Sequence, residues 1–161
     1  MKNTIIEYNV RFGDPESLNI LSLLQTDFVD ICEKAIAGKL HDLQKLEFRK
    51  SATVLKYLCP EGYPNHPVKD VPITIDSKLT ENENQEIFMA SVEEQKNKIF
   101  LKGSRAIGVL GVGKTLEEAL KNCEALIPFF HGPLFYRKDI GRKDSIEKKK
   151  NHIKKLRGTN F

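Results

Sequence analysis

The chain has 161 residues, 40% of them hydrophobic and 30% charged, which is a common balance for a globular protein with one ordinary core. Its three cysteines are widely spaced and include no Cys-x-x-Cys pair, so neither a disulfide framework nor a zinc site is indicated. No stretch approaches the ~20 apolar residues that span a bilayer, and the chain does not begin with the apolar core of a signal peptide, so we expect a cytoplasmic protein.

Residues 6–12 alternate in polarity in the way that a β-strand requires. One face would carry Glu7, Asn9 and Arg11, and the other would carry Ile6, Tyr8, Val10 and Phe12. A carboxylate and an amide oxygen two residues apart suit a hard cation such as Mg²⁺, and Arg11 could donate two hydrogen bonds to a phosphate that the metal holds. Alternation alone also fits a half-buried strand whose polar face only contacts water, and by itself favours that simpler interpretation.

Residues 13–16, Gly-Asp-Pro-Glu, predict the start of a helix. Asp14 can cap free backbone N–H groups, Pro15 suits the first helical position, and Glu16 favours the positive end of the helix dipole. Apolar residues then recur as on one buried helical face, at Leu18, Leu21, Leu24, Phe28 and Ile31, and Gly38 is a suitable stop. These capping roles explain Asp14 and Glu16 without any part in a site.

Beyond Gly38 the sequence predicts short strands separated by turns. The expected strands are 46–48, 53–58, 87–91, 98–102 and 105–112, and the polar residues 76–85 are expected to form a loop. Consecutive short strands favour an antiparallel sheet. A second helix is predicted over residues 115–127, because Thr115 and Glu118 form a capping box and Pro128 ends the helix.

The segment from Gly108 to Thr115 matches the P-loop pattern G-x-x-x-x-G-K-[ST], in which backbone amides cradle phosphates and Lys114 would reach the outer ones. Three features weigh against a P-loop. The segment is typical of the end of a buried strand, Thr115 serves as a helix cap, and no later strand ends in an Asp that could hold magnesium. A P-loop also requires a parallel sheet of βαβ units.

The positive charge is concentrated towards the end of the chain. Residues 137–157 contain ten Lys and Arg against three Asp and Glu, a net +7, so the rest, with 16 basic and 19 acidic residues, carries −3. Ile146, Ile153 and Leu156 form a thin apolar stripe among these lysines. The pattern favours a solvated amphipathic helix docked on the domain and leaves an RNA- or phosphate-binding patch as the alternative. No aromatic residues are interleaved with the lysines to stack on bases.

Several motifs together resemble one family of ligases. Glu7-Tyr-Asn-Val-Arg11, continuing as Phe-Gly-Asp-Pro-Glu16, is similar to the metal-binding strand of ATP-grasp enzymes, and in this spelling to that of the phosphoribosylamine-glycine ligase family. Further stretches resemble the same family in the same order, at residues 52–64, 89–94, 104–109, 115–119 and 135–141. The resemblance covers nearly all of residues 5–157 and is to the carboxy-terminal part of such ligases.

The resemblance implies an α+β fold. Residues 1–40 would be the end of the ATP-grasp domain, namely its last, metal-binding strand and a helix. Residues 41–161 would be the small C-terminal domain of the ligase, with a mostly antiparallel sheet, one packed helix and a basic C-terminal helix. The family's adenine pocket, phosphate-covering loop and amino-terminal substrate domain have no counterpart in the sequence. We therefore expect a partner chain to carry these lobes, and this chain alone to be inactive.

The implied reaction is the ATP-dependent joining of glycine to 5-phosphoribosylamine in purine synthesis. In it, ATP phosphorylates the glycine carboxylate, and the ribosyl amine then displaces the phosphate. The resemblance assigns Glu7 and Asn9 to Mg²⁺ or Mn²⁺, and Arg11 to the catalytic task of offsetting charge on the acyl phosphate. It places Asp14 or Glu16 on the substrate side. No residue resembles a clamp for the nucleotide base, and neither a membrane nor nucleic acid is an expected partner.

Two alternatives from other classes remain open on the sequence. One is a non-catalytic remnant or interaction module that keeps the family fold but not its activity. The other is a P-loop nucleotide-binding protein, suggested by residues 108–115.

Overall fold

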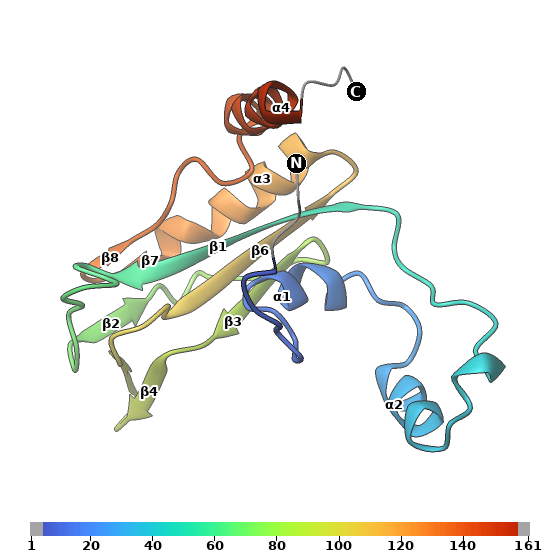
Figure 1. The fold of residues 1–161 in the computed structure, drawn as a ribbon. Coiled ribbons are helices and arrows are strands. Elements are labelled where there is room, and N and C mark those ends of the chain that lie inside the picture. Colours follow the sequence, from blue (N-terminus) through green and yellow to red (C-terminus); the bar gives the residue numbers. More distant parts are fainter. Residues whose placement is uncertain (1–4, 158–161) are drawn as a thin grey trace. The chain divides into compact units, whose positions relative to one another are not determined.

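The computed structural model describes residues 5–157, and the chain divides into two compact units. The helical unit comprises residues 9–51, and the sheet unit comprises the chain from Ala52 onwards together with the residues up to Tyr8. Figure 1 shows the elements of both. Among the described residues, no helix combines the length and the apolar character needed to cross a lipid bilayer.

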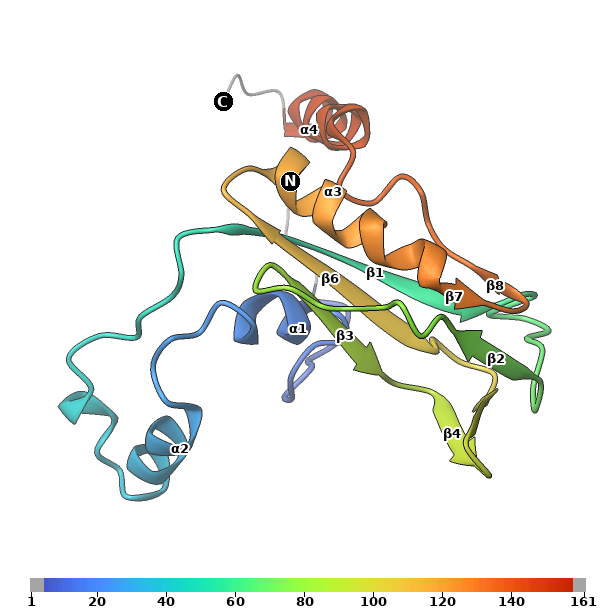
Figure 2. The same ribbon diagram turned by 180° about the vertical axis from the view of Figure 1, so that it is seen from behind.

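Two four-stranded sheets form the framework of the sheet unit (Figures 1 and 2). The first has the order β3 (Gln85–Met89), β6 (Ile107–Gly113), β1 (Ala52–Pro60) and β8 (Leu134–Phe135). The second has the order β4 (Val92–Gln95), β5 (Lys98–Leu101), β2 (Pro72–Ile75) and β7 (Phe130–His131). The described pairings are antiparallel, which confirms the expected sheet type.

Helix α3 (Leu116–Leu126) packs against β1 and β6 of the first sheet (Figure 2). The predicted cap is formed: Thr115 Oγ1 accepts a hydrogen bond from Glu118 N at 3.2 Å, and Glu118 Oε2 accepts one from Lys114 N at 2.8 Å. The helix gives way at Ile127–Phe129 to a 3-10 turn that contains Pro128, as expected. The core joins α3 to both sheets and includes Val54, Leu58, Ile73, Leu101, Val109, Ala119 and Leu126.

The glycines of β6 account for the P-loop-like spelling. A Cβ atom on Gly111 would lie 2.2 Å from the carbonyl oxygen of Ala119, and one on Gly113 would lie 2.5 Å from the nitrogen of Ala119. Helix α3 can lie this close to β6 only because these two positions have no side chain. Residues Ile107–Gly113 are all buried, and β6 pairs with β1 on one edge and β3 on the other. The stretch therefore forms a strand where a P-loop requires an open turn.

The helical unit contains α1 (Glu16–Leu21), α2 (Phe28–Ile36) and a 3-10 turn (Leu40–Asp42). The single helix predicted up to Gly38 is wrong, because the chain leaves the helix after α1 and pairs with a later segment. Leu24 forms a β-bridge with Phe48, and Gln25 N donates to Glu47 O at 2.9 Å. Helix α2 then restarts at Asp27, whose side chain caps Val29 N at 2.7 Å.

The buried helical face predicted for this unit is also not formed. No residue between Asn9 and Ser51 is buried, and Phe28 is 42% exposed although its ring lies 5.8 Å from that of Phe12. The predicted stop is correct, since Gly38 has a φ of +68°, a conformation that favours glycine.

The strand predicted over residues 6–12 is not formed. Residues 5–10 have no regular secondary structure, and Ile6 and Val10 are 95% and 93% exposed. A β-strand is held by hydrogen bonds to a neighbouring strand, and the described part of the chain offers none here. The alternation of Glu7, Asn9 and Arg11 is therefore not fixed by a sheet.

The other predicted strands are largely correct. Residues 53–58, 87–91, 98–102 and 105–112 correspond to β1, β3, β5 and β6, whereas residues 46–48 form only the bridge at Phe48. The predicted loop is confirmed over residues 76–84, and Gln85 already belongs to β3. Strands β2, β4, β7 and β8 were not predicted.

The basic C-terminal helix is confirmed as α4 (Lys143–Arg157), but its docking on the domain is not. None of its residues is buried, and Ile153 and Leu156 are 45% and 52% exposed. Only Ser145 and Ile146 are partly covered. Three apolar residues offer too little area to offset the loss of conformational freedom on docking.

Candidate functional site

A small polar pocket in the helical unit gathers most of the residues that the sequence singled out. Its lining consists of Asn9, Arg11, Gly13, Asp14 and Glu16, and its volume is about 280 Å³. The structure thus brings together one amide, one guanidinium and two carboxylates within a short turn. We refer to it as the Asn9–Glu16 pocket.

The turn before α1 shapes this pocket. Gly13 O accepts a hydrogen bond from Ser17 N at 3.0 Å, which closes the first turn of the helix. The Glu16 carboxylate folds back over Gly13, because a Cβ atom placed there would lie 2.6 Å from Glu16 Oε2. A side chain at position 13 would displace that carboxylate. The position therefore keeps Glu16 in the pocket.

Asp14 does not have the capping role predicted for it. The N-cap position of α1 is Pro15, and no side chain caps the helix there. Pro15 therefore precedes the helix instead of occupying its first position, and Asp14 lies one residue further out. Asp14 therefore lines the pocket and is not the N-cap residue of α1.

Arg11 lies at the edge of the same turn. Its Nη1 donates a hydrogen bond to Phe12 O at 2.8 Å, which leaves the other guanidinium N–H groups as donors for a ligand. Glu7 precedes the pocket by two residues, is exposed, and lies in the segment without regular structure. Among the described residues, no group of three or more His, Cys, Asp or Glu side chains lies close enough to hold a metal ion.

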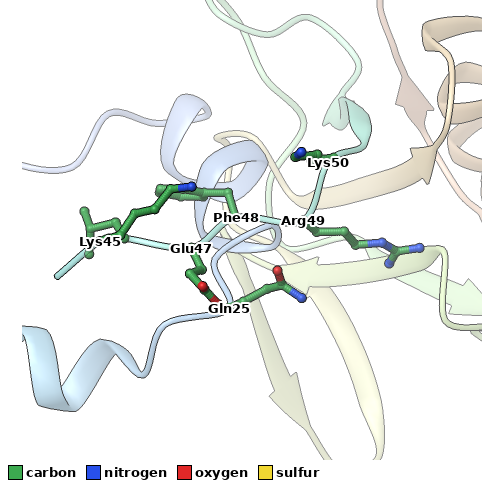
Figure 3. A pocket seen from close by; sticks show the side chains of 7 residues that line it. Gln25, Lys45, Glu47, Phe48, Arg49 and Lys50 are labelled. Atoms are coloured by element: carbon green, nitrogen blue, oxygen red, sulfur yellow. The ribbon is translucent and has the colours of Figure 1, made fainter. Parts of the chain in front are cut away.

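A second pocket of the helical unit lies along the segment that pairs with residues 23–26. It has a volume of about 520 Å³ and is lined by Gln25, Lys45, Leu46, Glu47, Phe48, Arg49 and Lys50. Figure 3 shows that the charged ends of Lys45, Arg49 and Lys50 do not converge on one point. The arrangement is therefore not that of a preformed anion site.

A charged cluster around one buried lysine in the sheet unit was not predicted from the sequence. Lys56 on β1 is fully buried, and its Nζ lies 2.8 Å from Glu124 Oε1 on α3 and 5.4 Å from the centre of the Tyr136 ring. Arg142 Nη2 lies 3.0 Å from the same carboxylate oxygen. The only signal in the sequence was one lysine among the apolar residues of a predicted strand.

The cluster changes the acidity of its carboxyl group. Burial alone would raise the pKa of Glu124, but the hydrogen bond and charge of Lys56, together with Arg142, lower it below its usual range. The neighbouring Cys123 thiol is buried, which raises its pKa to about 12 and keeps it protonated and unreactive. The cluster therefore carries fixed charges and no nucleophile.

Comparison with known proteins identifies the family of the chain. The family model described as "Phosphoribosylglycinamide synthetase, C domain" matches residues 53–143, which covers most of the sheet unit. The chain belongs to this synthetase family. Its match begins at the start of β1 and ends where α4 begins.

Curated members of the synthetase family extend the similarity beyond that domain. A phosphoribosylamine–glycine ligase of Methanococcus maripaludis is 45% identical over 152 residues, and one of Pyrococcus furiosus is 46% identical over 154 residues. These alignments cover 94% and 96% of the chain but only 34% of each relative. An alignment of 152 of the 161 residues omits nine, so most of the helical unit must be included.

The crystal structure of a phosphoribosylamine–glycine ligase from Thermotoga maritima has the same fold. It matches with a TM-score of 0.67 and 32% sequence identity, over 84% of this chain and 32% of that one. The chain thus spans about a third of the length of the synthetases that it matches.

Proposed function

We propose that this chain supplies the metal-binding and substrate-side edge of a phosphoribosylamine–glycine ligase, which joins glycine to 5-phosphoribosylamine with ATP. The Asn9–Glu16 pocket carries the proposal, because it gathers an amide oxygen, two carboxylates and a guanidinium at the motif that resembles the ligase family. The similarity of archaeal ligases over 94% or more of the chain supports it.

Arg11 has the chemistry required for the anionic intermediate. An acyl phosphate and the transition state in which it forms carry negative charge on several oxygens, and a planar guanidinium can donate to two of them at once. Since Arg11 uses one N–H group on Phe12 O, the rest of its donors can serve the substrate while that bond fixes the side chain. Asp14 and Glu16 in the same pocket can accept hydrogen bonds from the amino group of glycine or of the ribosylamine.

The donor set fits a hard divalent cation. Glu7 can offer carboxylate oxygens and Asn9 its amide oxygen, and Mg²⁺ or Mn²⁺ bound by one or two protein ligands keeps its other positions for water and phosphate oxygens. When bound, the metal would neutralise charge on the transferring phosphates of ATP.

The proposed activity needs a polypeptide that holds ATP. The relatives are about three times as long as this chain, and none of the described residues resembles a clamp for the adenine base. The helical unit buries none of its residues, and Ile36 and Val29 are 89% and 63% exposed. Apolar surface of this kind is typical of an interface. We infer that it packs against the ATP-binding lobes, whether these come from the same polypeptide or from a partner.

A chimera tests the proposed function. The C-terminal third of the Methanococcus maripaludis ligase would be replaced by this chain, and release of ADP that depends on glycine and phosphoribosylamine would be measured. We expect turnover by the chimera and none by this chain alone, because two metal ligands without a nucleotide pocket cannot position ATP. A folded chimera without activity would favour the alternative of a non-catalytic module.

A further inference from the structure

The last eleven residues of α4 form an arm that the rest of the described chain does not cover. Every residue of this α4 arm, from Glu147 to Arg157, is exposed. The sequence left two alternatives for the basic helix, docking on the domain or binding of RNA or phosphate. The structure does not show the docked arrangement, which leaves the binding of RNA or phosphate as the alternative.

The base of α4 is held in place although the arm is not. Arg142, directly before the helix, accepts a hydrogen bond from Ile146 N at 3.2 Å through its carbonyl oxygen. Its guanidinium lies 3.0 Å from Glu124 on α3, and Glu124 is in turn paired with the buried Lys56. The arm therefore extends from a fixed base.

The arm carries a charge that its own chain does not neutralise. Over Glu147–Arg157 there are six Lys and Arg against Glu147 alone, a net +5. Lys150 pairs with Glu147 at 2.9 Å, but Lys148, Lys154 and Lys155 form no ion pair with the described part of the chain. Isolated helices of this length are marginal in water, and like charges four residues apart weaken them further. An anionic partner would relieve this repulsion.

The distribution of the charges around the helix selects among anionic partners. At about 100° per residue, Lys150, Lys154 and Arg157 share one side, and Lys148 and Lys155 lie roughly 140° away from it. The remaining lysine of the arm, Lys149, lies about 100° from the first side in the other direction, beside the apolar residues. A lipid surface or a groove on a protein requires one broad apolar face, whereas the arm offers little beyond Ile153 and Leu156. Cations on two sides suit two lines of phosphates, as on the walls of a nucleic-acid groove.

We propose that α4 binds the phosphodiester backbone of a nucleic acid. The family model ends at residue 143, where α4 begins, whereas the alignments with whole ligases cover 94% and 96% of the chain and so include most of α4. The proposed contact uses lysines of α4 and no residue of the Asn9–Glu16 pocket, so its test does not depend on the ligase function proposed above. It would be sequence-tolerant, because lysines contact phosphates and the arm has no aromatic side chain to stack on bases.

Fluorescence anisotropy of the full chain tests this proposal, with a labelled single-stranded RNA of about 20 nucleotides and a DNA duplex of similar length as separate probes. The test variant is Lys148→Gln/Lys149→Gln/Lys154→Gln/Lys155→Gln. Its matched control, Lys78→Gln/Lys96→Gln/Lys98→Gln/Lys121→Gln, removes the same charge from exposed lysines outside α4. Circular dichroism would establish that both variants keep the helix content of the parent.

We expect the test variant to bind at least about tenfold more weakly than the control, whichever probe the parent prefers. Four phosphate contacts to a single strand also predict a loss of roughly fiftyfold in affinity when salt rises from about 50 to about 200 mM. Preference for RNA or DNA identifies the source of the phosphates. Equal weakening by both variants, or no saturable binding of either probe by the parent, would overturn the proposal and leave an acidic protein surface as the partner of the arm.

Discussion

Lys56 Nζ lies 2.8 Å from Glu124 Oε1, and the Lys56 side chain is fully buried while that of Glu124 is 27% exposed. Removal of Lys56 and removal of the Glu124 charge therefore affect the remaining partner differently. Without Lys56, Glu124 keeps Arg142 and contact with water. Without the charge of Glu124, the Lys56 ammonium remains buried beside the ring of Tyr136 with no carboxylate partner among the described residues, and its contact with Lys138 O is long, at 3.4 Å.

This asymmetry predicts unequal effects of substitution on stability. Glu124→Gln should lower the free energy of unfolding by about 3 kcal/mol, because it leaves a buried charge unpaired. Lys56→Met should change it by no more than about 1 kcal/mol, since an apolar side chain of similar volume can fill the site. The double variant should recover most of the loss caused by Glu124→Gln. Urea unfolding of the four proteins measures this coupling, and additive effects would contradict it.

The same carboxylate predicts an acid sensitivity. Because the pKa of Glu124 is lowered in the folded state, the unfolded chain binds its proton more readily as the pH falls below the ordinary value of about 4.3. The stabilisation by Glu124 is thus present at neutral pH and is lost as the pH falls through the lowered pKa. Stability measured between about pH 6 and pH 3 should fall more steeply in the parent than in Glu124→Gln. Parallel curves would show that the ion pair contributes nothing.

Strand β6 contains a glycine that lies against α3, Gly111, and one that does not, Gly108, and the two together test how the helix packs on the strand. Gly111→Ala should cost at least ~2 kcal/mol, because its Cβ would lie 2.2 Å from backbone atoms of Ala119 and Cys123. Gly108→Ala is the matched control on the same strand: its Cβ would meet other atoms only at 3.5 Å, an ordinary contact distance, and its effect should stay within about 1 kcal/mol. Thermal unfolding compares the two variants. Equal losses of stability in the two variants would mean that the close approach of α3 is not the reason for a glycine at position 111.

Local patterns in the sequence were sufficient to predict those strands and helices that pack against elements within the described chain. Strand β6 and helix α3 were predicted because buried runs and a capping box are local signals, and each finds its neighbour within the sheet unit. The break between α1 and α2 could not be predicted in this way. It depends on pairing of Leu24 with Phe48, which the helical periodicity of the apolar residues does not reveal.

In the candidate site, too, local features were predicted from the sequence and features that depend on distant residues were not. Asn9, Arg11, Asp14 and Glu16 were selected from one short motif, and the structure places them around one pocket because they follow a single turn. The strand expected to present Glu7 was not formed, since a strand requires a partner that the described chain does not provide. The Lys56 cluster was missed because its partners are distant in sequence.

The exposed segment before the pocket predicts how the chain behaves alone. Ile6 and Val10 are almost fully exposed, so backbone amides of residues 5–12 should exchange with solvent rapidly, and the isolated chain should associate at high concentration. Addition of the ATP-binding lobes should slow exchange there and suppress association. Hydrogen exchange and sedimentation at several concentrations measure both. Strong protection in a concentration-independent monomer would indicate a self-sufficient module.

The metal dependence of the chimeric ligase tests the assignment of Glu7 and Asn9 most directly. Turnover would be measured against Mg²⁺ concentration for the parent chimera, for Glu7→Gln and Asn9→Ala, and for the control Lys114→Ala. We predict that Glu7→Gln and Asn9→Ala each lower kcat at least about tenfold and raise the Mg²⁺ requirement, with unchanged thermal stability, while Lys114→Ala has little effect. If Glu7→Gln and Asn9→Ala kept normal turnover at the same Mg²⁺ concentration but unfolded at a lower temperature, the result would contradict the account. Glu7 and Asn9 would then have a structural role instead of binding the metal.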